Sequence, residues 1–150
     1  MKIFNLAALS LLATAATAEP TLRRRTLGLE PHEEVSMNNM VKIRVINEAY
    51  QQPFGPFFVM THNSEEKPLF KVGQNATAAL AHLAENGDPS QLMDAYETSN
   101  NVGYVGRVDD HAPYFGGETL EFKVPYNHDY PYLTIASMAV NTNDCFVALN

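Results

Sequence analysis

Cysteine, basic residues and long apolar runs are all scarce in this chain. Its 150 residues include one cysteine, so neither an intrachain disulfide framework nor a cysteine-based zinc site is available. Lys and Arg number 10 against 17 Asp and Glu, and the net charge of −7 disfavours a protein that binds the phosphate backbone of nucleic acids. With 45% hydrophobic residues, the composition is nonetheless that of a single globular domain.

The most extended apolar run lies at the N-terminus. Met1-Lys2 is basic, the segment up to Ala16 is mostly apolar, and Ala16-Thr17-Ala18 is a small-x-small cleavage sequence. The run is shorter than the roughly 20 residues of a membrane span, which favours a signal peptide over a membrane anchor. We therefore expect residues 1–18 to be a signal peptide, and the protein to be secreted, extracellular and without a transmembrane anchor.

Residues 19–39 lack the periodicity of a helix or a strand and are expected to form a flexible N-terminal segment. The Arg23-Arg24-Arg25 run within it fits a solvated charge run better than a protease processing site, although the sequence allows both.

Alternating apolar residues from Met40 onwards predict short strands. Apolar residues alternate with charged ones in Val41–Val45 and Leu120–Val124, whereas 132–140 has little charge and fits a central strand. Further strands are expected at Phe57–Thr61, Leu69–Val72, 102–108 and Cys145–Leu149. The residues expected to be largely buried are Val41, Ile43, Val45, Leu69, Phe70, Leu80, Leu83, Leu120, Phe122, Leu133, Ile135, Phe146 and Val147.

Two short helices are expected between these strands, at about residues 75–97. Asn75 can cap the first helix and Gly87 can end it, while Asp88 and Pro89 can begin the second. Because strands and helices do not alternate, the pattern predicts a mostly all-β fold: an antiparallel β-sandwich with a short two-helix insertion.

Several segments together resemble the spondin domain of the F-spondin and mindin type. They are Gln52–His62, Leu69–Gly73, Leu80–Leu92, Gly117–Phe122, Leu133–Met138 and Asn143–Val147. Their order and spacing over about residues 40–149 are similar to those of compact, secreted, one-domain members. The resemblance implies a C2-like sandwich over 40–150, and an extracellular adhesion or ligand-binding role toward a cell-surface or matrix ligand, such as a glycan or glycolipid.

The resemblance also implies a calcium ion held by aspartates. One of these ligands falls on Asp144, in Asn143-Asp144-Cys145-Phe146-Val147. The other family ligands belong to a downstream Asp-Ala-Gly-Thr-Asp segment that does not occur in the 150 residues, so we expect a C-terminally incomplete spondin domain and an incomplete calcium site. Read from the residues alone, Asp144 fits a turn residue better than a metal ligand.

Three other positions carry candidate chemistry. Asp109-Asp110 could hold a cation, although solvation in a loop is the simpler interpretation. Asn75-Ala76-Thr77 is an N-glycosylation sequence, and a glycan on Asn75 competes with its use as a helix cap, which we favour. Cys145 has no adjacent activating base, so we expect a buried structural thiol, or a thiol that pairs with a second chain.

Aromatic residues gather near the expected turns and could stack on sugars or contact partners. They are Phe54, Phe57, Phe58, Tyr114, Phe115, Tyr126, Tyr130 and Tyr132, of which Phe57 is equally explained as core.

The sequence contains no His-Glu-x-x-His zinc motif, no Gly-x-Ser-x-Gly nucleophile motif and no Gly-rich phosphate loop. We therefore expect a secreted non-catalytic binding module. The alternatives are a secreted hydrolase with an unrecognised active site, and a truncated gene product without autonomous function.

Overall fold

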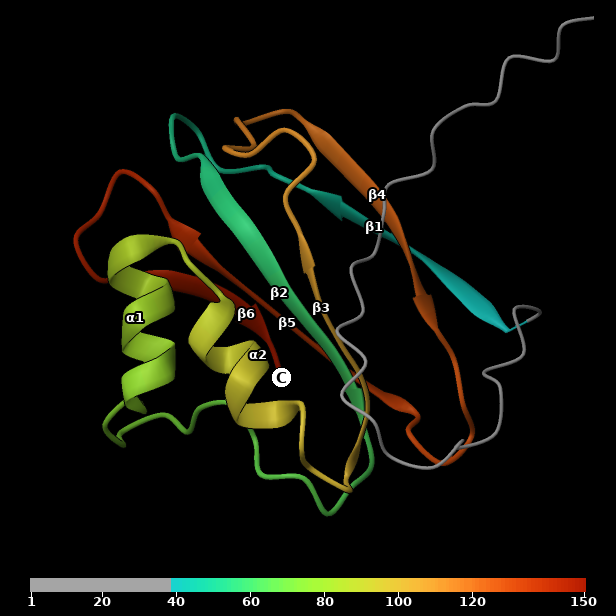
Figure 1. The fold of residues 1–150 in the computed structure, drawn as a ribbon. Helices are drawn as coiled ribbons and strands as arrows, with labels where there is room; N and C mark the ends of the chain where they lie inside the picture. The colour runs from blue at the N-terminus through green and yellow to red at the C-terminus, as the bar shows by residue number, and fades with distance from the viewer. Residues whose placement is uncertain (1–38) are drawn as a thin grey trace, which may run out of the picture.

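A computed structural model describes residues 39–150. The expected signal peptide at 1–18 and the N-terminal segment up to residue 38 lie outside the described residues. The described part is mostly β, with two helices, as predicted (Figure 1). In chain order its elements are β1 (Met40–Ile46), β2 (Phe54–His62), α1 (Ala78–Asn86), α2 (Ser90–Tyr96), β3 (Val102–Val108), β4 (Thr119–Pro125), β5 (Tyr132–Ala139) and β6 (Phe146–Leu149).

The strands form two antiparallel sheets. Strands β1 and β4 pair with each other, and a second sheet has the order β3-β2-β5-β6. Strand β5 lies between β2 and β6, and its residues Thr134–Ser137 are all buried. The prediction of a central strand at 132–140 is therefore confirmed.

Strand β2 is buried on both faces because its alternate side chains belong to two different cores. Phe57 and Val59 pack with Leu120 and Val124 of β4. Phe58 and Met60 point the other way, into a cluster with Leu80, Leu83 and Leu92 of the helices. The four-stranded sheet is thus covered by the β1–β4 pair on one face and by both helices on the other (Figure 1).

The cap of helix α1 is Thr77, which corrects the prediction of Asn75. The Thr77 side chain accepts a hydrogen bond from the Leu80 amide at 3.2 Å. Gly87 ends the helix with a φ of +67°, as expected for a left-handed cap. Helix α2 begins one residue later than predicted, with Pro89 rather than Asp88 at its N-cap position and no side-chain capping bond from Pro89. Asp88 Oδ1 still accepts a hydrogen bond from the Ser90 amide at 3.0 Å, just before the helix.

The strand expected at Leu69–Val72 is absent from the described residues, because its backbone bonds to a side chain rather than to a neighbouring strand. The Leu69 amide donates to Asn150 Oδ1 at 2.7 Å, and Asn150 Nδ2 donates to the Phe70 carbonyl. Leu69 is buried and Phe70 packs edge-on against Phe146, whereas Val72 is 96% exposed. Leu69 and Phe70 therefore anchor a loop on the core.

Of the thirteen residues expected in the core, five are buried, seven are partly buried and one is exposed. Leu69, Leu80, Leu83, Leu120 and Ile135 are buried. The partly buried ones are Ile43, Val45, Phe70, Phe122, Leu133, Phe146 and Val147. Val41 is exposed, contrary to the prediction, although its partner Val124 on β4 is buried.

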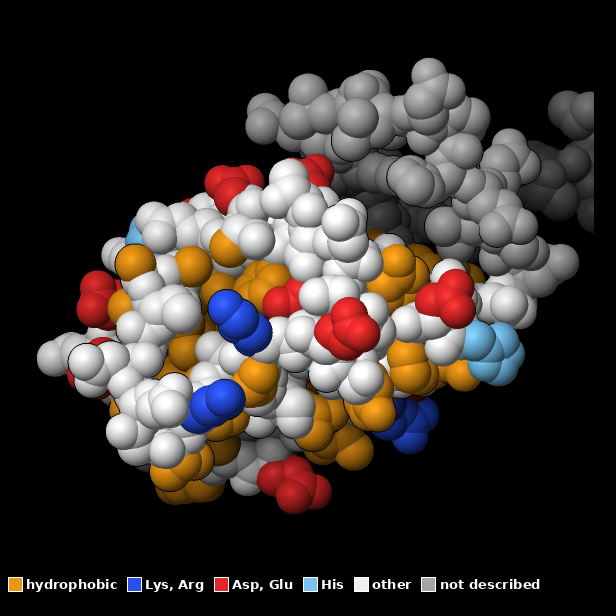
Figure 2. All heavy atoms as spheres, turned by 90° about the horizontal axis from the view of Figure 1, so that it is seen from below, with side chains coloured by type: hydrophobic (Ala, Val, Ile, Leu, Met, Phe, Trp, Pro, Cys, Tyr) orange, Lys and Arg blue, Asp and Glu red, His pale blue; other side chains and the backbone are white. Residues whose placement is uncertain are grey.

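Neither helix within residues 39–150 is long and apolar enough to cross a lipid bilayer. On the face seen in Figure 2, the Lys and Arg side chains are separated from one another by acidic and uncharged ones.

Candidate ligand-binding site

Three loops meet at one end of the four-stranded sheet. Strand β2 runs antiparallel to β3 and β5, with Phe57 opposite Val108 and Phe54 opposite Ala139. The start of β2 and the ends of β3 and β5 therefore lie together. We call this end the loop end, and it comprises residues 47–53, 109–118 and 140–145.

Two aromatic side chains stand exposed on adjacent loops at the loop end. Tyr50 is 87% exposed and Phe115 is 56% exposed. Together with Glu48, Ala49, Gln51, Gly116 and Gly117 they line an open hollow of about 500 Å³. We call Glu48–Gln51 and Phe115–Gly117 the aromatic loop site.

A buried amide holds these loops in place. The Asn47 side chain donates to the carbonyls of Gln52 and Tyr114, each at 2.9 Å, and its Oδ1 accepts from the Ala49 amide at 2.9 Å. Asn47 is 2% exposed, so a missing bond would leave an unsatisfied polar group in the interior. Both loops therefore depend on one residue for their position.

The loops also approach each other closely at Gly116. A Cβ atom added there would lie 2.5 Å from the Ala49 carbonyl oxygen, which is closer than real contacts allow. The absence of a side chain at Gly116 is thus a condition for the hollow between Tyr50 and Phe115.

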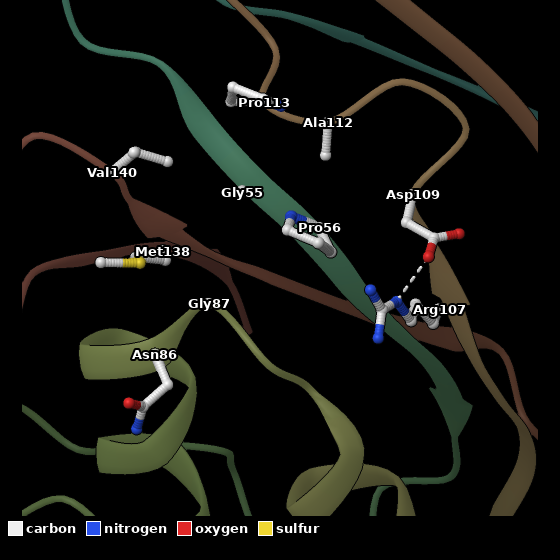
Figure 3. A pocket seen from close by; sticks show the side chains of 10 residues that line it. All are labelled: Gly55, Pro56, Asn86, Gly87, Arg107, Asp109, Ala112, Pro113, Met138 and Val140. Carbon is white, nitrogen blue, oxygen red and sulfur yellow. Dashed lines mark ion pairs between the residues drawn. The ribbon is translucent and has the colours of Figure 1, made fainter.

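A second hollow, of about 400 Å³, lies between the loop end and the junction of the helices (Figure 3). Its walls come from the start of β2, the end of α1, the end of β3 and its following loop, and the end of β5 (Figure 3). The residues are Gly55, Pro56, Asn86, Gly87, Arg107, Asp109, Ala112, Pro113, Met138 and Val140.

The charged groups beside this second hollow are already paired with one another. Arg107 Nε lies 2.8 Å from Asp109 Oδ2, and Arg107 Nη1 lies 3.7 Å from Asp88 Oδ1. His82 Nε2 lies 3.5 Å from Asp88 Oδ2. Hydrogen bonds from the Ser90 hydroxyl and amide, with His82 and Arg107 nearby, hold the pKa of Asp88 below its usual value. These contacts connect α1, the junction between the two helices, and β3. We therefore assign them a structural role in holding these elements together.

The predicted metal ligands lie at the loop end, but they do not assemble a cage. Asp144 is exposed in the loop before β6, while Asp109 and Asp110 follow β3. Asp109 is engaged by Arg107, and within residues 39–150 no three His, Cys, Asp or Glu side chains converge on one point. Calcium takes six to eight oxygen ligands as a rule. Asp144 is the only carboxylate in the loop before β6.

Cys145 is exposed, contrary to the expectation of a buried thiol. It lies in the turn that precedes β6, where its amide donates to Thr142 Oγ1 and its carbonyl accepts from the Ala139 amide. The backbone of Cys145 therefore extends the β5–β6 pairing while its side chain faces solvent.

The aromatic residues named from the sequence divide between the core and both ends of the sheet. Phe57, Phe58 and Tyr114 are buried, and Phe54 is partly buried beside them. Tyr126, Tyr130 and Tyr132 lie between β4 and β5 or at the start of β5, which is the end opposite the loop end. Of the predicted set, only Phe115 is exposed at the loop end. Tyr50 is not in that set, although it immediately precedes Gln51-Gln52-Pro53, which leads into β2.

Comparisons with models of protein families, with curated protein sequences and with solved structures found no match for this chain. Membership of the spondin family stays a prediction from the sequence motifs.

Proposed function

We propose that this chain is a secreted, non-catalytic adhesion module of the spondin type, which binds an extracellular glycan or glycolipid at the aromatic loop site. The observation that carries the proposal is the pair of exposed aromatic rings, Tyr50 and Phe115, on loops that the buried Asn47 amide holds in place. Binding surfaces are commonly built from loops fixed on a rigid scaffold.

The packing of the sheets supports the fold part of this proposal. Side chains of β2 and β5 meet those of β4 across a common apolar core, and every strand pair is antiparallel. Two antiparallel sheets that face each other in this way fit a C2-like sandwich, with α1 and α2 as the insertion.

The composition of the aromatic loop site supports a sugar ligand. The C–H faces of a pyranose ring are weakly apolar and stack on aromatic rings, which Tyr50 and Phe115 provide. Sugar hydroxyls need donors and acceptors close to that platform, and Glu48 and Gln51 line the same hollow. An open hollow with apolar and polar groups suits one or two sugar units better than a buried small molecule.

A glycan array probed with the secreted full chain tests the proposal. We expect Tyr50→Ala and Phe115→Ala each to weaken binding at least about tenfold, the effect of losing about 1.4 kcal/mol at a central contact. Tyr132→Ala is the matched control, because Tyr132 is 52% exposed but lies at the opposite end. Binding that survives both loop variants, or that falls equally with Tyr132→Ala, contradicts the assignment.

The spondin resemblance further implies calcium at Asp144, and the arrangement of the loop supports weak binding only. One carboxylate with backbone oxygens is a poor donor set, and extracellular calcium modules already bind at ~10⁻⁴–10⁻³ M. An ion that binds the native state raises the melting temperature. We expect a small rise in millimolar calcium that is lost in Asp144→Ala. A rise that survives this variant and disappears in Asp110→Ala would place the ion at the loop after β3 instead.

A further inference from the structure

The segment that leads into α1 contains the only Asn-x-Ser/Thr sequence of the chain, Asn75-Ala76-Thr77. All residues from Lys71 to Ala78 are exposed, and no hydrogen bond engages the Asn75 side chain within residues 39–150. The segment follows a turn in which the Gln74 amide donates to the Lys71 carbonyl at 3.1 Å. The Asn75 side-chain amide, which would accept the glycan, is therefore open to solvent.

The structure removes the conflict between a glycan and a helix cap. Thr77, not Asn75, has the extended backbone of a capping residue, with φ of −68° and ψ of 157°. Its hydroxyl accepts the Leu80 amide and its carbonyl accepts the Ala81 amide. Modification of Asn75 consumes neither of these groups, so α1 keeps its cap when a glycan is attached two residues earlier.

We propose that Asn75 is N-glycosylated during export of this chain, an inference that rests on the proposed secretion. Nδ2 of Asn75 attacks the anomeric carbon of an oligosaccharide carried on a lipid diphosphate. A new C–N bond forms, the bond between that carbon and the diphosphate oxygen breaks, Nδ2 loses one proton, and the lipid diphosphate leaves. No oxidation or reduction takes place.

The segment with Asn75 and the second hollow lie at opposite ends of α1. Asn86 and Gly87, at the other end of α1, line the second hollow, whereas the segment with Asn75 precedes the first turn (Figure 1). Nine helical residues span about 13 Å. The attachment point for a glycan therefore lies about one helix length from the second hollow.

The test is expression of the full chain in a secreting eukaryotic host, with four variants that separate the glycan from the cap. Asn75→Gln and Thr77→Asp lose the acceptor sequence but keep a capping side chain, Thr77→Ser keeps both, and Thr77→Ala loses both. We expect a mobility shift that peptide N-glycosidase removes in the wild type and in Thr77→Ser, and no shift in the other three.

Thermal unfolding of the enzymatically deglycosylated proteins checks the second half of the argument. Asn75→Gln should melt with the wild type, whereas Thr77→Ala should melt about 3–8 °C lower because its helix cap is gone. A melting temperature that falls in Asn75→Gln as far as in Thr77→Ala overturns the separation of the two roles.

The two proposals fail in distinguishable ways. Unmodified wild type in the medium overturns glycosylation and leaves secretion standing. A chain that stays inside the cells without modification overturns secretion, and glycosylation with it.

Discussion

Replacement of Tyr114 by Phe should stabilise this protein, although Tyr114 is part of its core. The ring is 2% exposed and packs against Phe57 and His111, with centroid distances of 5.6 and 4.7 Å. The backbone of Tyr114 is fully used, because it exchanges two hydrogen bonds with Phe54. The Tyr114 hydroxyl is the only buried side-chain polar atom without a hydrogen-bond partner within residues 39–150.

An unsatisfied buried polar group costs about 1–3 kcal/mol. Tyr114→Phe removes that group and leaves the ring contacts in place, at the expense of a void the size of one oxygen atom. We expect a net gain in the free energy of unfolding of about 1 kcal/mol, which corresponds to a melting temperature about 4 °C higher. Urea denaturation followed by circular dichroism at pH 7 measures both quantities on the same samples.

The dependence of the free energy of unfolding on alkaline pH gives an independent check on the same hydroxyl. Burial, together with the Asp110 and Asp109 carboxylates, raises the pKa of Tyr114 to about 12 from its usual 10.0, while the backbone amides of His111 and Asp110, which approach the hydroxyl without forming a well-aligned hydrogen bond, offset part of the rise. Because the folded-state pKa is the higher one, this contribution to stability is complete below pH 10 and is lost as the pH rises from 10 to about 12. The Phe variant has no such group and should lose less stability over this window.

Tyr104→Phe is the matched control. Burial also raises the pKa of Tyr104 to about 12, so Tyr104→Phe should likewise reduce the loss of stability at alkaline pH. It should bring no gain at pH 7, because Tyr104 is not an unsatisfied buried group. A loss of more than about 0.5 kcal/mol in Tyr114→Phe at pH 7 would refute the reasoning, since it would mean that the hydroxyl has a stabilising partner such as an ordered water.

Three further predictions concern other parts of the fold. Gly116→Ala should lower the free energy of unfolding by about 1–3 kcal/mol, because its Cβ would lie 2.5 Å from the Ala49 carbonyl oxygen. An unchanged midpoint of urea denaturation would contradict the close approach of the two loops. Leu120→Ala, at a buried position, should lower the free energy of unfolding by about 2–5 kcal/mol, whereas Val41→Ala, at an exposed position, should lower it by less than about 0.5 kcal/mol. Similar decreases for both variants in chemical denaturation would contradict the core assignment. The lowered pKa of Asp88 adds stability that is present above its usual 3.8 and is lost as the pH falls through its folded-state pKa. Asp88→Asn should therefore weaken the dependence of the unfolding free energy on acidic pH. An unchanged dependence would count against the contacts of Asp88 with Ser90 and His82.

The alternating patterns predicted strands correctly, whereas the short apolar run at Leu69–Val72 did not. The alternation in Val41–Val45 and Leu120–Val124 appears as β1 and β4, which pair with each other. Leu69–Val72 has similar composition, but a strand also needs a neighbour with free backbone groups. Here the Asn150 side chain provides the bonds to Leu69 and Phe70, and a local pattern cannot reveal that partner.

The helix cap shows the same limit at a smaller scale. Asn75 and Thr77 are both good capping residues, and they lie two positions apart. The choice between them follows from the core, because Leu80 must face the cluster with Phe58 and Met60, and Thr77 is the residue three positions before it. Tertiary packing therefore fixes the start of α1.

The candidate site was only partly predictable, since exposure depends on which end of a strand a loop joins. Tyr126, Tyr130 and Tyr132 seemed equivalent to Phe115 in the sequence, yet the antiparallel pairing of β2 with β5 sends them to the opposite end. Cys145 precedes an apolar pair and still faces solvent, because the strand begins one residue later.

Asn47 connects the fold to the candidate site more directly than any of the aromatic residues. It follows the end of β1, and its amide bonds reach both the turn before β2 and the backbone of Tyr114, 67 residues further along the chain. The same residue also exchanges backbone bonds with Glu118 and Gly117, at the start of β4. A loop held by one buried side chain has few conformations to lose on binding, which lowers the entropic cost of ordering Tyr50 and Phe115 around a ligand. The rigidity that makes the aromatic loop site suitable for binding is therefore a consequence of how β1 and β4 pair, because that pairing brings Asn47 beside the loop that carries Phe115.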